Sequence, residues 1–185
     1  MLNALEAQLK QLALDSKDPF ATTIRRLVGL PEAPRYAKPL RRFVLAMPTM
    51  IREIQAWSGQ TEQPPSLRRL QLYALNYLYS PTDFLPDGNL GLFSYLDDVY
   101  LLASVMQRTL NESEAIGKRL SIRDKSVRKE LPNWLNMTRQ LLPTETMKID
   151  QLMDEINHRG DEGMAWAMSQ SAKEGPSSRR LKGRK

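Results

Sequence analysis

Four aspartates, Asp83, Asp87, Asp97 and Asp98, occur in the stretch SPTDFLPDGNLGLFSYLDD at residues 80–98. Carboxylates gathered in this way can bind a hard cation such as Mg²⁺ or Ca²⁺, or act as a catalytic acid–base pair. Their spacing differs from that of the aspartate-rich calcium loop, and the stretch contains neither histidine nor glutamate. A metal-dependent enzyme built on these four side chains is therefore one hypothesis.

Helix capping is the favoured interpretation of the same aspartates. The pattern S-P-x-D at 80–83 places a serine N-cap, a first-turn proline and an acid at the positive end of a helix. The pattern S-x-x-D at 94–97 repeats this arrangement, and P-D-G-N at 86–89 is typical of a turn. Each cap stabilises its helix by about 1 kcal/mol. The motif and capping residues are Ser80, Pro81, Asp83, Pro86, Asp87, Ser94, Asp97 and Asp98.

The segment YLYSPTDFLPDGNLGLFSYLDDVYLLA resembles the YkvA-type family of small bacterial domains of unknown function. That family has S-P-x-D-x-x-P-D, a short apolar loop with glycine, and L-D-D at a helix start. The resemblance covers about residues 67–110 and implies a helical hairpin, without a catalytic mechanism. The loop GNLGLFSY is less hydrophobic than its family counterpart, which often looks membrane-associated. The matching positions are Ser80, Pro81, Asp83, Pro86, Asp87, Leu96, Asp97 and Asp98.

Apolar residues recur at helical spacing along the chain, which predicts an all-α single domain of six to eight helices. Asp18-Pro19 is expected to open a helix that Gly29 closes. Proline-marked turns are expected from 31 to 39, and Pro48 should kink or split the helix after them. We expect an N-terminal helical arm at 1–58, a helical core at 66–172 and a disordered basic tail at 173–185.

Charge is distributed unevenly. The formal net charge is +6, of which the last thirteen residues carry +5. Residues 117–139 contain seven Lys or Arg against two acids, whereas residues 144–162 contain six acids against two Lys or Arg. Arg-Arg pairs occur at 25–26, 41–42, 68–69 and 179–180. These arginines can lie on solvated helix faces and form ion pairs with the acidic C-terminal helix, or they can contact nucleic-acid phosphates together with the basic residues of 117–139. No motif of known nucleic-acid-binding folds is present. The nucleic-acid-binding candidates are Lys118, Arg119, Arg123, Lys125, Arg128, Lys129, Arg179, Arg180, Lys182, Arg184 and Lys185.

Several kinds of chemistry have no support in the sequence. The chain has no cysteine, no apolar stretch of about 20 residues for a membrane span, and no secretory signal at its N-terminus. His158, the single histidine, is predicted to end a helix before Gly160. No nucleophile motif or phosphate-binding glycine loop occurs. We expect a cytoplasmic protein without a cofactor.

The leading hypothesis is a non-enzymatic protein that binds another protein, because amphipathic helices are predicted at both ends, Leu2–Leu12 and Met147–Met168. Homo-oligomerisation is left open. Nucleic-acid association through the tail and the basic stretch is the alternative, and the metal-dependent aspartate site is the second alternative.

Overall fold

The computed structural model describes residues 2–60, 63–78 and 90–173, and this part of the chain is helical without a strand. The predicted all-α class is confirmed. The α-helices are α1 (Leu2–Leu14), α2 (Phe20–Val28), α3 (Ala33–Leu45), α4 (Met47–Ser58), α5 (Pro65–Tyr77), α6 (Leu96–Ala115), α7 (Lys125–Leu141), α8 (Pro143–Arg159) and α9 (Asp161–Lys173), and the 3-10 helix η1 (Gly91–Tyr95) leads into α6.

The described residues contain nine α-helices, one more than the largest number expected, and a proline lies in the first turn of α3, α4, α5 and α8. Pro48 lies in the first turn of α4, where a helix needs no N–H from that residue, so the predicted split occurs at Ala46. The prediction of turns through residue 39 was wrong. Pro34 occupies the first turn of α3 and Pro39 lies inside this helix.

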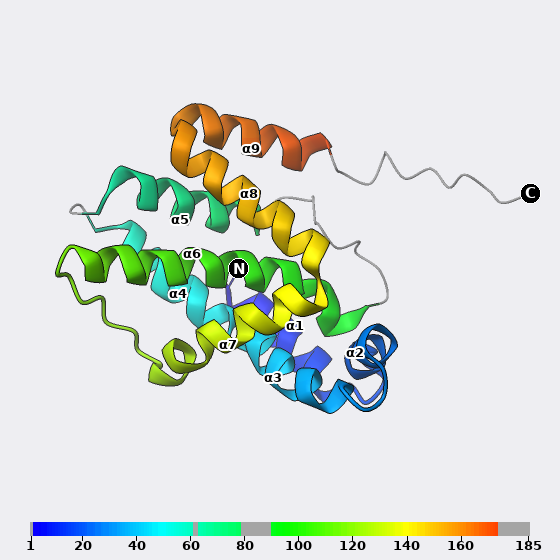
Figure 1. Ribbon diagram of the computed structural model, residues 1–185. Coiled ribbons are helices and arrows are strands. Elements are labelled where there is room, and N and C mark those ends of the chain that lie inside the picture. The colour runs from blue at the N-terminus through cyan, green and yellow to red at the C-terminus, as the bar shows by residue number, and fades with distance from the viewer. Residues whose placement is uncertain (1, 61–62, 79–89, 174–185) are drawn as a thin grey trace, which may run out of the picture.

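Helix α6 forms the centre of the molecule, with α5 and α8 on one side and α4 and α7 on the other (Figure 1). Residues 101–106 are all buried. Six consecutive residues span more than one helical turn, so α6 is covered around its whole circumference.

The N-terminal helices pack into the same hydrophobic core as the rest of the chain. Phe43 of α3 stacks on Trp134 of α7 with their ring centroids 5.2 Å apart. Asp18 joins two helix starts, because its carboxylate accepts hydrogen bonds from the N–H groups of Phe20 and Leu92, both at 2.9 Å. Segments 1–58 and 66–172 therefore contribute side chains to one continuous core.

The C-terminal helices α8 and α9 form a hairpin that packs on α5 (Figure 1). The hairpin turns at Gly160, which has a φ of 60° that favours glycine, and His158 lies in the last turn of α8 as predicted. Gly163 lets the two helices approach closely, because a Cβ atom there would overlap the Glu155 carbonyl oxygen. The hairpin thus depends on a glycine at position 163.

Gly163→Ala should destabilise the protein by about 1–3 kcal/mol, because the backbone of α8 must shift to admit the new methyl group. Gly59→Ala is the matched control. Gly59 has a φ of −79°, and a Cβ atom there would lie 4.0 Å from its nearest neighbour, so this change should leave stability unchanged or slightly raised. Urea unfolding followed by circular dichroism measures both. Equal stability of the two variants would contradict the close packing of α8 and α9.

Candidate functional site

The predicted aspartate cluster is only partly within the described residues. Ser80, Pro81, Asp83, Pro86 and Asp87 lie outside them. Within the described part of the chain, no group of three or more His, Cys, Asp or Glu residues is placed to hold a metal ion.

The two remaining aspartates lie in the first turn of α6, as predicted. Asp97 is buried and Asp98 is half-buried. The prediction that Ser94 caps this helix was wrong. Ser94 belongs to the 3-10 helix η1, and its hydroxyl donates to the Gly91 carbonyl at 2.8 Å. Because η1 runs directly into α6, the N–H of Leu96 bonds to the Phe93 carbonyl, and Tyr95 occupies the N-cap position without a side-chain cap.

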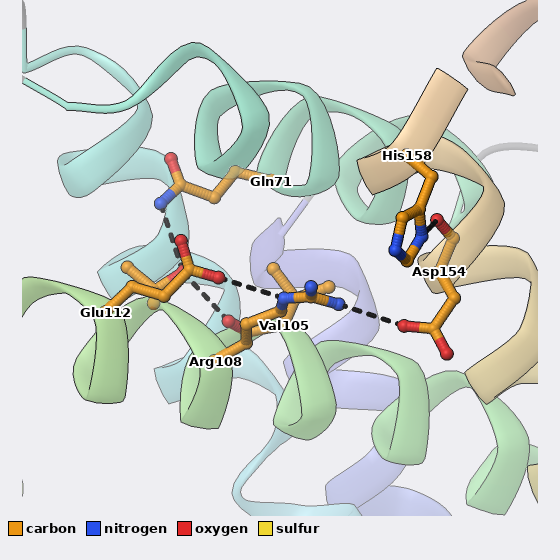
Figure 2. Close-up of polar contacts among 7 residues, drawn as sticks. Gln71, Val105, Arg108, Glu112, Asp154 and His158 are labelled. Atoms are coloured by element: carbon orange, nitrogen blue, oxygen red, sulfur yellow. Dashed lines mark hydrogen bonds and ion pairs between the residues drawn. The ribbon is translucent and has the colours of Figure 1, made fainter. Parts of the chain in front are cut away.

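Arg108 links α6 to α8 at the junction shown in Figure 2. Its Nε lies 3.0 Å from Glu112 Oε1, and its Nη1 lies 3.3 Å from Asp154 Oδ1. The Nδ1 atom of His158 lies 2.7 Å from the backbone carbonyl oxygen of Asp154. This contact occupies one ring nitrogen of the single histidine, within its own helix.

Gln71, which is labelled in Figure 2, forms a buried polar contact between α5 and α6 with Thr109. The side-chain amide of Gln71 donates to Thr109 Oγ1 at 3.2 Å and to Gln63 Oε1 at 2.8 Å. The Thr109 hydroxyl in turn donates to the Val105 carbonyl at 2.8 Å. Buried polar groups need such partners, so this contact has a structural role.

Tyr100, Asp150 and Arg139 form a third polar group, between α6, α8 and α7. The Tyr100 hydroxyl donates to both carboxylate oxygens of Asp150, at 2.9 and 3.0 Å. The Arg139 guanidinium lies 5.5 Å from the centroid of the Tyr100 ring, and its Nε lies 3.4 Å from Asp150 Oδ2. Burial, together with the negative charge of Asp150, raises the pKa of Tyr100 well above its ordinary value of 10.

An open cavity of about 390 Å³ lies beside these polar groups. Its charged lining side chains form pairs, Arg108 with Asp154 and Arg139 with Asp150, so their charges balance. The cavity is lined by Ser104, Gln107, Arg108, Asn111, Leu135, Arg139, Asp150, Met153 and Asp154.

Three arginines form ion pairs between the acidic hairpin and the rest of the molecule. Arg69 of α5 lies 3.7 Å from Asp161 of α9, and Arg108 and Arg139 make the pairs with α8 already described. One arginine from each of α5, α6 and α7 is used. The predicted pairing of arginines with the acidic C-terminal helix therefore occurs, although only Arg69 belongs to an Arg-Arg pair in the sequence.

The basic stretch at 117–139 differs from these three paired arginines, because most of its cations have no acidic partner among the described residues. Six residues before and within the first turns of α7 are all exposed. Arg128 pairs with Glu114 at 3.6 Å, an exposed contact worth less than about 1 kcal/mol. Arg119, Arg123, Lys125 and Lys129 have no ion pair within the described part of the chain. We call this set the basic surface: Lys118, Arg119, Arg123, Lys125, Arg128 and Lys129.

The backbone beneath the basic surface is held in place by hydrogen bonds. Glu53 of α4 is 4% exposed, and its Oε1 accepts the backbone N–H of Arg123 at 3.0 Å. Asp124 caps α7 by accepting the hydroxyl and N–H of Ser126, at 2.6 and 2.9 Å. These hydrogen bonds lower the pKa of Asp124. The sequence gives no local signal for Glu53, because its partner lies 70 residues away.

A second open cavity, of about 450 Å³, lies within the basic surface. Lys125, Arg128 and Lys129 line one side, since residues at i, i+3 and i+4 share a helix face. Leu120, Ser121 and Ile122 of the preceding loop complete the lining. The structure thus brings three of the predicted cations together around one cavity.

The remaining predicted cations belong to the tail and lie outside the described residues: Arg179, Arg180, Lys182, Arg184 and Lys185. No helix in the described part of the chain is long and apolar enough to cross a membrane. Comparisons with protein-family models, curated proteins and solved structures find no match to this chain.

The Tyr100 contact predicts a pH dependence of stability. Folding raises the pKa of Tyr100, so above pH 10 the unfolded chain loses this proton while the folded chain keeps it. The free energy of unfolding should therefore fall as pH rises above 10, by up to about 1.4 kcal/mol per pH unit from this group. Denaturant unfolding from pH 8 to 11 should show a smaller fall for Tyr100→Phe than for the wild type. Identical pH profiles would contradict this role of Tyr100.

Proposed function

We propose that the protein is a non-enzymatic nucleic-acid-binding protein that uses the basic surface. The observation that supports this proposal most directly is that one set of cations on the protein is paired with acids and another set is not. Arg69, Arg108 and Arg139 have aspartate partners in the C-terminal hairpin. Four of the six cations of the basic surface have no ion pair among the described residues, so their charge is available to an external anion.

Nucleic acid suits such a surface because every phosphate carries a negative charge. Neutralising phosphates with Lys and Arg releases condensed counterions, and this release supplies most of non-specific affinity. Residues 118–129 contain six cations and one acid, Asp124, and the carboxylate of that acid accepts the hydrogen bonds that start α7. Hydrogen bonds already hold the backbone at Arg123 and at the start of α7. Binding therefore costs less conformational entropy than it would for a flexible loop.

The sequence-based preference for a protein partner loses its main support from the structure. The helix at the N-terminus packs Leu2, Leu5, Leu9 and Leu12 against the core. Helix α8 likewise buries most of its apolar side chains, namely Ile149, Leu152, Met153 and Ile156, whereas Met147 is 53% exposed. Packing within the molecule therefore explains the N-terminal amphipathic helix and most of α8, but not the part of the predicted segment Met147–Met168 that forms α9.

Two further proposals concern family and location. Membership of the YkvA-type family is supported by the pattern S-P-x-D-x-x-P-D followed by L-D-D over residues 80–98. A cytoplasmic location is supported by the absence of cysteine from the sequence.

Fluorescence anisotropy of labelled single-stranded and duplex DNA and RNA, at two salt concentrations, tests nucleic-acid binding. Lys125→Glu/Lys129→Glu should weaken binding at least about tenfold and reduce the salt slope for single strands by about 1.4, because two phosphate contacts are lost. Arg25→Glu/Arg26→Glu is the matched control. It makes the same charge change on exposed residues of α2, at the far end of the molecule from the start of α7 (Figure 1).

A full-length variant with the five tail cations changed to glutamine separates the contribution of the tail. Binding that this variant keeps, and that Lys125→Glu/Lys129→Glu loses, supports the basic surface. Equal weakening by the α2 control would instead indicate a general charge effect. Binding that disappears with the tail cations alone would contradict the proposal.

Protein binding through α9 is the second candidate, favoured by two exposed apolar side chains. Trp166 and Met168 are 36% and 41% exposed, and exposed aromatic and methionine side chains are enriched at interfaces. Met168→Glu should abolish retention of a partner in pulldowns from native cells, whereas Gln151→Glu, on an exposed position of α8, should not. Equal retention by the two variants would argue against α9 as the interface.

A further inference from the structure

We propose that the cavity within the basic surface binds one unpaired nucleotide of a single strand. This inference rests on the proposed nucleic-acid function and adds a preference for single strands over duplexes. The base would occupy the cavity, over the side chains of Leu120 and Ile122. The adjoining phosphates would contact Lys125, Arg128 and Lys129.

The first observation is the mixed chemistry of the cavity. Three cations line the cavity together with two apolar side chains, Leu120 and Ile122, which we call its apolar floor. Ile122 is only 8% exposed and Leu120 is half-buried, so this floor is part of the folded body. Binding to the phosphates of a duplex would require only exposed cations and no recess. A recess with an apolar floor beside three cations suits a ligand that joins a flat apolar group to a phosphate, as an unpaired nucleotide does.

The second observation is the size of the cavity. Its volume of about 450 Å³ falls within the range of small-ligand sites, roughly 300–1,000 Å³. Both of its walls are fixed. The loop is held by the hydrogen bond from Arg123 N–H to Glu53, and the first turn of α7 by the cap from Asp124.

The third observation concerns the other side chains at the cavity. Ser121 is exposed and carries a hydroxyl that can both donate to and accept from the edge of a base. The Arg128 guanidinium is planar and can stack on a base. Its pair with Glu114, at 3.6 Å between half-exposed side chains, is loose enough to exchange for a phosphate.

Three probes of equal length test this inference by fluorescence anisotropy with the full-length protein: labelled oligothymidylate, an abasic oligonucleotide with the same phosphates, and a duplex. Oligothymidylate should bind at least about fivefold more tightly than the abasic strand, because contact with one base contributes this much or more. It should also bind more tightly than the duplex. Equal binding of the normal and abasic strands would overturn the base-binding cavity but leave phosphate binding intact. Binding of none of the three would overturn the proposed function itself.

Two variants locate the effect. Leu120→Ser removes apolar surface from the cavity and should weaken oligothymidylate binding while leaving abasic binding unchanged. Lys129→Gln removes a charge and should weaken both. Circular dichroism confirms that the variants fold. The comparison of the three probes on the wild type does not depend on either variant. Competition by polyglutamate as effective as that by oligothymidylate would overturn the inference in favour of an acidic peptide.

Discussion

The burial of α6 around its whole circumference at residues 99–106 is the constraint on which the rest of this structure depends. A helix segment buried around its whole circumference must be covered on every side, and five other α-helices, from both halves of the chain, contact α6. Its polar side chains must also find partners. Thr109 bonds to Gln71 and to its own helix, and Tyr100 bonds to Asp150. The polar contacts beside the first cavity therefore follow from covering α6 with α5, α7 and α8.

The same packing separates the charges of the molecule. Covering α6 brings the acidic hairpin against arginines of α5, α6 and α7, and Arg69, Arg108 and Arg139 pair with acids of α8 and α9. Each of those acids is therefore already paired with an arginine within the molecule. The loop before α7 follows the C-terminal end of α6, and the hydrogen bond from the Arg123 N–H to Glu53 holds it in place. Its cations are left exposed, and the net charge of the folded body, close to zero by composition, conceals a local excess of positive charge.

Local patterns predicted the helical class and many helix boundaries. Gly29 and Gly160 end helices as expected, because their positive φ values favour glycine. The predicted split at Pro48 separates α3 from α4. The predicted cap at Ser94 failed because a 3-10 helix precedes α6, and tertiary packing decides that choice. The contact of Glu53 with the Arg123 backbone spans 70 residues, and the pair of Arg108 with Asp154 spans 46. Neither produces a local pattern. The basic stretch was recognised from composition, whereas the cavity within it requires the fold.

Backbone amide chemical shifts of the ¹⁵N-labelled full-length protein, recorded while oligothymidylate is added, test the central claim most directly. They report on each residue without a mutation, and they distinguish the basic surface from the rest of the molecule in one titration. The account predicts saturable shifts at residues 118–129, including Ser121 and Lys129, with little change along α2 and α9. Shifts confined to α9 or to the tail, or no shifts at all at low salt, would contradict it.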